Sequence, residues 1–339
     1  MTDSKSKKII PKIAGVLIAG ILIVLVVNLI SGGLLGLYAD YGYSYVKREA
    51  KNVTIEDERV PPMKLFLHPE DTVVTTNIIE NGLWELNETH WTTKLVRPGD
   101  TYVDVGANVG YYTVLASHLV GPKGKVFAFE PDPVNFAILE KNVRINGLTN
   151  VVLEQKACSN EQGSIQLFLA GGNKGDHRIY QTEEGRTAID VEAVKLDDYF
   201  AEYAGSIDFV KIDTQGAEGV ILDGLGDVID KNEDIVMAVE YWPSGLGLGY
   251  TYKDIQKFLR SHDLLFYDVG KGDEKELMNL TYVDEAFLDE AFTVENEQFT
   301  NIVAVKGLKE FSALKGDEAD QFKISVWEKH GRTVPESVH

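Results

Sequence analysis

Apolar and polar positions alternate along the middle of the chain in a way that predicts strands and helices in turn. Apolar runs typical of buried strands occupy residues 101–107, 125–130, 150–158, 208–214, 234–242, 264–270 and 299–307. Helix-like stretches between them occupy residues 110–120, 133–146, 217–229 and 252–262. Strands that alternate with helices predict an α/β fold, in which a parallel sheet is covered by helices on both faces.

Two further segments depart from this order. Residues 164–170 and 188–196 have the alternation of β-strands and flank a polar loop at 171–187. They predict extra β structure beside the main sheet. The last segment, 310–339, is charged and irregular, and we expect a short helix and a frayed tail there.

The N-terminal region has a different pattern. No charged residue occurs from Ile13 to Leu37, a run long enough to cross a bilayer core of about 30 Å with some tilt. We expect a transmembrane helix, with a cleaved signal peptide or a buried core helix as the alternatives. The predicted organisation is a tail and transmembrane helix (1–37), a juxtamembrane linker (38–62), one catalytic domain (63–309) and a C-terminal tail (310–339).

Charge and cysteine content narrow the classes of partner. The formal net charge is −20, which repels phosphate backbones, so we expect no nucleic-acid partner. The one cysteine, Cys158, lies in a predicted strand and cannot form a disulfide framework or a cysteine-based zinc site. The seven histidines are scattered, and we expect no metal site.

The stretch YVDVGANVGYYTV lies where the first predicted strand gives way to a helix. It spaces Asp104, Gly106, Asn108 and Gly110 as D-x-G-x-N-x-G. Gly106 permits a sharp turn, and we expect Gly110 to allow a ligand to approach the backbone closely. Ligands of such sheets bind outside the carboxyl ends of the strands. The dinucleotide fingerprint does not fit, because Asn108 and Tyr111 stand where it requires glycine or a small residue.

The acids at these strand ends favour a cationic ligand that carries a ribose. A pyrophosphate prefers a helix terminus without a nearby carboxylate, whereas S-adenosylmethionine carries a sulfonium and an ammonium group and no phosphate. The second predicted strand ends in Glu130, within FAFEPDP. A carboxylate at this position can accept hydrogen bonds from both ribose hydroxyls.

Four blocks together resemble the FkbM-type family of S-adenosylmethionine-dependent methyltransferases. They are YVDVGANVGYYTVLAS, GKVFAFEPDPVNFAILEKNVRINGLTNVVLEQKACSNEQGSIQLFL, VKLDDYF and DFVKIDTQGAEGVILDGL, and the resemblance covers about residues 63–270. It implies the class I methyltransferase fold, a Rossmann-like seven-stranded sheet with an antiparallel last strand. It also implies O-methylation of a hydroxyl, commonly on a sugar, a glycolipid or a secondary metabolite.

The resemblance further implies which residues surround the donor. Those expected near its methionine part are Asp104, Gly106, Asn108 and Gly110. Glu130 would hold the ribose, and those expected around the adenosine are Pro131, Asp132, Ala157 and Cys158. Asp213, at the end of the fourth strand, would face the reacting methyl group.

A sugar hydroxyl is a weak nucleophile, so we expect a base near the methyl group. The candidates are Asp213, His177, Glu218 and Glu240, each with a structural alternative: helix capping for Asp213, loop exposure for His177, a plain strand end for Glu240. The family usually reads K-I-D-x-E-G-x-E, whereas this chain has K-I-D-T-Q-G-A-E. Gln215 therefore cannot serve as a base, which leaves Glu218 as the acid of this motif.

The residues after Glu240 suggest a place for the acceptor. Tyr241 and Trp242 follow it at the end of a predicted strand, and aromatic faces suit sugar rings, so we expect a ligand-facing rim there.

Three functions are compatible with these patterns. The first is a membrane-anchored methyltransferase acting on a lipid-linked or cell-envelope carbohydrate. Its catalytic domain would be cytosolic, where S-adenosylmethionine is made, although lysines before the apolar run favour the opposite orientation. The second is a membrane-tethered, non-catalytic cofactor-binding module, which only the glutamine at 215 supports. The third is a nicotinamide-dependent oxidoreductase, which the mismatch with the dinucleotide fingerprint opposes.

Overall fold

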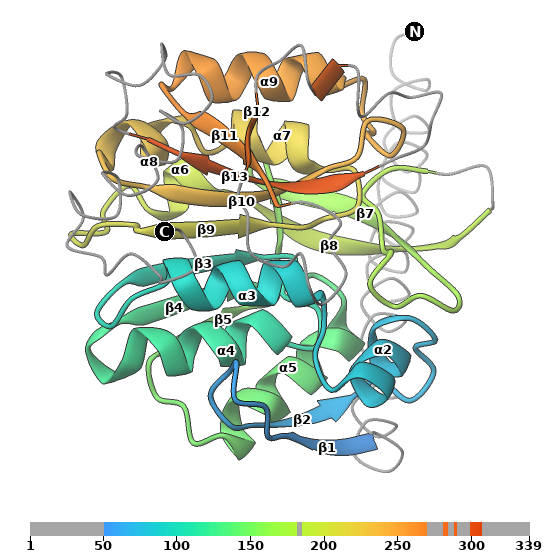
Figure 1. The fold of residues 1–339 in the computed structure, drawn as a ribbon. Helices are drawn as coiled ribbons and strands as arrows, with labels where there is room; N and C mark the ends of the chain where they lie inside the picture. Colours follow the sequence, from blue (N-terminus) through green and yellow to red (C-terminus); the bar gives the residue numbers. More distant parts are fainter. Residues whose placement is uncertain (1–50, 182–184, 270–280, 284–287, 290–298, 307–339) are drawn as a thin grey trace, which may run out of the picture.

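The computed structural model describes residues 51–181, 185–269, 281–283, 288–289 and 299–306. Its centre is a sheet of eight strands (Figure 1). In spatial order these are β12 (Thr281–Val283), β11 (Leu265–Asp268), β13 (Thr300–Val305), β10 (Val236–Tyr241), β9 (Phe209–Ile212), β3 (Thr101–Val105), β4 (Lys125–Phe129) and β5 (Val151–Glu154).

The directions of the strands agree with the predicted fold class. Strands β5, β4, β3, β9 and β10 are parallel, whereas β13, the last strand, pairs antiparallel with both β10 and β11. The seven strands of the predicted sheet are present, and β12 adds an eighth, antiparallel strand at the edge beside β11. A strand of three residues is too short to give a recognisable alternation.

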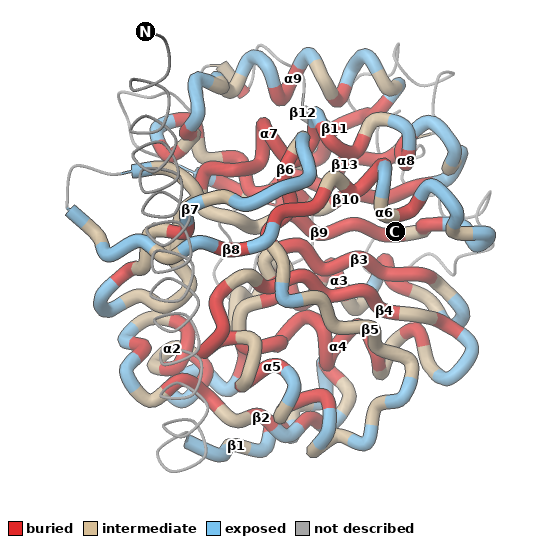
Figure 2. The backbone as a smooth tube through the Cα atoms, turned by 180° about the vertical axis from the view of Figure 1, so that it is seen from behind, coloured by how far each residue is buried: buried red, intermediate tan, exposed pale blue. Residues whose placement is uncertain are grey.

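Helices cover both faces of this sheet. The first group, with α4 in front of the sheet in Figure 1, is α3 (Leu86–Leu95), α4 (Tyr111–Val120) and α5 (Pro133–Ile145). The second group is α6 (Leu196–Tyr199), α7 (Glu218–Asp223), α8 (Gly226–Lys231) and α9 (Tyr252–Ser261). Strand β3 illustrates the division, because Tyr102 packs with the first group and Val103 with the second. In Figure 2 the central strands are accordingly red and the outer side of α9 is largely pale blue.

Two predicted elements are divided in the structure. The expected strand at 150–158 is β5 followed by β6 (Ala157–Ser159), and β6 leaves the main sheet to pair with β8 (Thr187–Lys195). The expected helix at 217–229 breaks between α7 and α8 at Gly224. A Cβ there would lie 2.4 Å from the carbonyl oxygen of Ser159, so the chain passes too close to β6 for a continuous helix of larger residues.

The extra β structure predicted beside the sheet is confirmed. Strand β7 (Gly163–Leu169) pairs antiparallel with β8, and with β6 they form a separate three-stranded sheet. This small sheet lies at the carboxyl ends of the main strands and supplies one wall of the site described below.

The segment before β3 is part of the fold. Strands β1 (Lys51–Ile55) and β2 (Met63–Leu67) form an antiparallel pair, and α2 (Val74–Asn81) follows. The segment expected to be a linker, 38–62, therefore contains strand β1. Asn142 of α5 fixes β2, because its Oδ1 accepts from Phe66 N at 2.6 Å and its Nδ2 donates to Phe66 O at 2.9 Å.

The predicted transmembrane helix at 13–37 and the predicted tail at 310–339 lie outside the described residues. Within the ranges that the structure describes, every helix is too short or too polar to cross a membrane.

Candidate active site

A cavity of about 120 Å³ opens at the carboxyl ends of β3, β4 and β9. Because β3 lies between β4 and β9, the cavity has two sides. The Glu130 side, which follows β4, comprises Asn108, Glu130, Pro131, Ala157 and Cys158. The Asp213 side, which follows β9, comprises Trp84, Glu85, Tyr112, Lys211 and Asp213.

The loop from β3 to α4 explains the spacing of the D-x-G-x-N-x-G motif. Gly106, Asn108 and Gly110 all have positive φ angles, of 83°, 50° and 88°. Glycine and asparagine are the residues that tolerate this region best, so the motif encodes a loop of alternating left-handed residues. A Cβ on Gly106 would lie 2.1 Å from the carbonyl oxygen of Asp213, and this glycine therefore brings the two sides together.

Two residues of this motif do not line the cavity. A Cβ added to Gly110 would lie only 2.4 Å from Leu139 Cδ1. This glycine therefore allows α4 to pack against α5, and it does not serve the approach of a ligand. Asp104 is buried and accepts a hydrogen bond from Thr113 Oγ1 at 2.6 Å. Its side chain is on the sheet face that α4 covers, beside its register partner Lys211, so it contributes charge and not the predicted direct contact.

Glu130 is held by backbone N–H groups. Its Oε2 accepts from Asn108 N at 2.8 Å and its Oε1 accepts from Asp132 N at 2.9 Å. Burial, together with the charge of Asp132, raises the pKa of Glu130 to about 8. The carboxyl group is therefore positioned at the tip of β4 before any ligand binds.

Asp132 does not line the cavity. It caps α5, with its Oδ1 accepting from Val134 N and Asn135 N. Its Oδ2 lies 3.9 Å from His177 Nε2. In the structure Asp132 therefore starts the helix, and its predicted contact with adenosine stays a prediction.

His177 lines the cavity, but its bonding is unsuited to a base. Its Nδ1 accepts from Ala170 N at 2.9 Å, and burial lowers its pKa. A neutral imidazole whose Nδ1 accepts must carry its proton on Nε2, which leaves no lone pair to take a proton from an acceptor.

On the Asp213 side, charged side chains hold one another. Lys211 Nζ donates to Asp213 Oδ2 at 2.7 Å. Burial opposes the ionisation of Asp213, but Lys211 outweighs it and holds the carboxyl pKa below its ordinary value. Gln215 Nε2 donates to Asp213 Oδ1 at 3.2 Å and to both carboxylate oxygens of Glu240, at 3.0 and 3.1 Å. An ionised Asp213 that accepts hydrogen bonds from both Lys211 and Gln215 is a weak base.

Two other predicted bases are structural. Glu218 is buried, and its Oε1 accepts from Thr214 N, Thr214 Oγ1 and Gly216 N, which fixes the turn into α7. Glu240 is buried behind Gln215 and does not line the cavity. Burial, with the charge of Asp213, raises its pKa well above the ordinary value.

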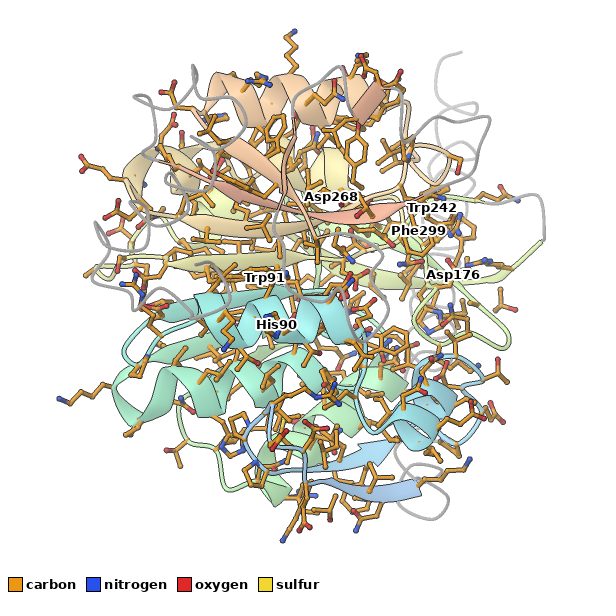
Figure 3. All side chains as sticks on the ribbon, viewed as in Figure 1. His90, Trp91, Asp176, Trp242, Asp268 and Phe299 are labelled. Atoms are coloured by element: carbon orange, nitrogen blue, oxygen red, sulfur yellow. The ribbon has the colours of Figure 1, made fainter. Side chains whose placement is uncertain are left out.

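The predicted aromatic rim is only partly present. Tyr241 is completely buried, and its hydroxyl accepts from Gln256 Nε2 at 2.8 Å. Trp242 lies outside the cavity lining and beside Phe299, with ring centroids 6.4 Å apart (Figure 3). The guanidinium of Arg178 stacks over Trp242 at 5.1 Å.

Sequence reasoning missed Glu85, Trp84 and Lys211. Glu85 precedes α3, and its Oε2 accepts from Tyr112 Oη at 3.0 Å. Nothing local in GLWELNETH marks this glutamate among its polar neighbours. Lys211 did carry a signal, since it is a charged residue within the apolar strand FVKI.

Comparison with known proteins identifies the family. Residues 104–266 match the model described as the Methyltransferase FkbM domain. This segment, which is just under half of the chain, is similar to the FkbM methyltransferase family. The family uses S-adenosylmethionine as methyl donor, which confirms the resemblance and the donor predicted from the sequence.

Curated relatives of this FkbM domain are methyltransferases. Methyltransferase sdnD of Sordaria araneosa is 28% identical over 178 residues, which cover 42% of this chain and 67% of that protein. The 31-O-demethyl-FK506 methyltransferase FkbM of Streptomyces tacrolimicus is 32% identical over 162 residues, which cover 39% of this chain and 62% of that protein. The chain thus spans about two thirds or less of the length of these relatives.

Among solved structures, M. jannaschii TYW2 in complex with AdoMet is 13% identical, with a TM-score of 0.39, and the match covers 76% of this chain and 86% of that one. Similarity at this level does not identify the residues of the site.

The cavity of the FkbM domain fits S-adenosylmethionine. Glu130 offers a buried carboxylate at the tip of β4 for the ribose hydroxyls. Ala157 and Cys158 give an apolar wall for the adenine ring. Asn135 Oδ1 is buried without a hydrogen-bond partner among the described residues, and Asn135 lines the cavity, so a donor group such as the adenine amino group would satisfy it. When bound, S-adenosylmethionine supplies an electrophilic methyl group on sulfur.

Among the described residues there is no group of three or more histidine, cysteine, aspartate or glutamate side chains that could hold a metal ion.

Proposed function

We propose that this protein transfers a methyl group from S-adenosylmethionine to a hydroxyl of a lipid-linked or cell-envelope carbohydrate. The observation that carries the proposal is the two-sided cavity of the FkbM domain. Its Glu130 side has the carboxylate and apolar wall that an adenosine needs, and its Asp213 side concentrates carboxylates where a sulfonium would lie. The two carboxyl groups on the Asp213 side, Glu85 and Asp213, favour a cationic group of the donor at this place.

Two observations support a hydroxyl acceptor with a ring. The relative from Streptomyces tacrolimicus is named for the O-methylation of FK506. In this chain, Trp84 lines the cavity beside Glu85, and an aromatic face suits the apolar face of a sugar. Much of the rate acceleration would come from holding the hydroxyl about 3 Å from the methyl carbon with water excluded.

The apolar run at 13–37 supports the membrane part of the proposal. A helix there would confine the domain to the plane of a lipid-linked acceptor. We place the domain in the cytosol, because its donor is made there. To test this, the exposed Lys123 is changed to cysteine in a Cys158→Ser background and labelled with a membrane-impermeant maleimide. Labelling only after the cells are broken supports the placement, and labelling of intact cells contradicts it.

The function is tested with the full chain, methyl-labelled S-adenosylmethionine and a membrane glycolipid extract. Transfer of label to a glycolipid, stable to mild base as an ether is, supports the proposal. Cofactor binding without transfer to any extracted lipid would instead support the non-catalytic module. Tight binding of a nicotinamide dinucleotide, measured by calorimetry, would support the oxidoreductase.

A further inference from the structure

Glu85 brings a carboxylate into the cavity from outside the segment that the family model matches. It stands at the N-terminus of α3, with backbone angles φ 42° and ψ 77°. This left-handed conformation is uncommon for a residue with a side chain. Tyr112 Oη, from α4, donates to its Oε2 at 3.0 Å and fixes the direction of the carboxyl group. Trp84, next to it in sequence, lines the same cavity.

The other two carboxyl groups and the histidine of the cavity are bonded to other partners. Asp213 is ion-paired with Lys211 at 2.7 Å and bonded to Gln215. Both oxygens of Glu130 accept backbone N–H groups on the far side of β3. His177 accepts a backbone N–H at the nitrogen that would otherwise act as a base.

The charges around Glu85 favour its neutral form in the free protein. Burial raises its pKa to about 8, with further contributions from the negative charges of Asp213 and Glu88. Lys211 and the hydroxyl of Tyr112 act in the opposite direction but do not cancel this effect. A sulfonium bound nearby would favour ionisation, so the donor itself would help to prepare a carboxylate.

We propose that Glu85 is the catalytic base, facing the methyl group that is transferred. The inference rests on the proposed O-methylation. The acceptor oxygen forms a bond to the methyl carbon, the carbon–sulfur bond breaks with its electron pair staying on sulfur, and Glu85 takes the hydroxyl proton. The products are a methyl ether, neutral S-adenosylhomocysteine and a protonated Glu85, which returns its proton to solvent.

The test compares the affinities of S-adenosylmethionine and S-adenosylhomocysteine, which differ by the methyl group and the sulfonium charge. For Glu85→Gln we expect the preference for S-adenosylmethionine to fall about tenfold, because one carboxylate facing the sulfonium is lost. S-adenosylhomocysteine should bind as in the wild type, which also reports a correctly folded variant. In the wild type, the preference for S-adenosylmethionine over S-adenosylhomocysteine should rise with pH as Glu85 ionises. In Glu85→Gln the part of this rise that Glu85 causes should be absent.

The matched control is Glu88→Gln, on the same face of α3. Glu88 does not line the cavity, and glutamine can still accept the bond that Asn301 Nδ2 donates to it at 2.6 Å. The preference of Glu88→Gln for S-adenosylmethionine over S-adenosylhomocysteine should stay within about twofold of the wild type, because the charge of Glu88 is farther from the donor.

Each outcome for Glu85→Gln decides the inference. Equal loss of affinity for both ligands places Glu85 at the ammonium group, which both carry, and overturns the proposal. No change in either affinity overturns it as well. If the wild type binds neither ligand, the proposed function fails instead. In the labelled transfer assay, Glu85→Gln should reduce kcat by about 10²–10⁴-fold and remove the alkaline rise of its pH profile.

Discussion

The two sides of the cavity hold their carboxylates in different ways. Glu130 is bonded by two backbone N–H groups that lie within 22 residues of it in the chain. On the Asp213 side, side chains bond one another, as Tyr112 does with Glu85 and Gln215 with Glu240.

This difference predicts that the Glu130 side recognises the shape of a ligand and the Asp213 side responds to its charge. A carboxylate held by backbone groups keeps its position as long as the loop keeps its conformation, so the Glu130 side behaves as a preformed receptor. Carboxylates held by side chains change their protonation when any partner changes, so the Asp213 side responds to pH and to the charge of the ligand. Substitutions on the first side should alter affinity for every adenosyl ligand, whereas substitutions on the second should alter discrimination by charge.

Gly106→Ala is expected to have the largest effect, because both sides meet at this residue. Its Cβ would lie 2.1 Å from the Asp213 carbonyl oxygen, and its φ of 83° is strained for alanine. We expect the affinity for S-adenosylhomocysteine to fall about 100-fold or more, measured by calorimetry. The control is Gly99→Ala, which has a φ of 96° with nothing within 4 Å of the added Cβ, and should bind normally. Normal binding by Gly106→Ala would show that the two sides are not in contact here.

Glu130→Gln should weaken both adenosyl ligands by the same factor. Above pH 8, where Glu130 is ionised, its charge-assisted bonds are worth about 1.5–3 kcal/mol, so we expect a loss of about 10- to 100-fold for each ligand. The ratio of the two affinities should not change, in contrast to Glu85→Gln. Glu154→Gln, at the end of the adjacent strand β5 and outside the cavity, is the matched control. A changed ratio in Glu130→Gln would contradict the separation of the two sides.

The same contrast explains what could be predicted from the sequence. The alternation of strands and helices, the loop at Gly106 and the position of Glu130 follow from short local patterns, since a strand, a loop and a strand end are encoded by consecutive residues. The position of Glu85 in the same cavity as Asp213 could not be predicted, because Glu85 comes from a separate element that only the fold brings there. The packing role of Gly110 could not be predicted, because a glycine that serves packing and one that serves a ligand look alike in sequence.

Gln215→Glu tests the Asp213 side through stability. The new carboxyl group would stand between Asp213 and Glu240, where Gln215 now donates hydrogen bonds to both. Burial and the negative charge of Asp213 would raise its pKa in the folded protein above the value in the unfolded chain. The folded state would then bind the extra proton more tightly, so the variant should match the wild type near pH 4.5 and lose stability as pH rises.

We expect the midpoint of thermal unfolding of Gln215→Glu to fall by about 2–8 °C at pH 8, corresponding to about 1–3 kcal/mol. The difference from the wild type should shrink steadily as the pH is lowered. A deficit that stays constant with pH would show that a lost bond, and not charge repulsion, destabilises the variant.

The smallest effect is expected at Cys158, on the apolar wall of the Glu130 side. Its side chain is buried, and burial raises the pKa of the thiol, so little thiolate is present at pH 8. We expect iodoacetamide to react about 100-fold more slowly than with a free thiol, and S-adenosylhomocysteine to slow it further by covering the wall. Cys158→Ala should change ligand affinity by less than about threefold, because it removes only a small apolar contact. The chain has one cysteine, so the labelling reports this wall alone. Rapid labelling that the ligand does not affect would mean that the adenine ring lies elsewhere, and that Glu130 binds its ligand without help from β6.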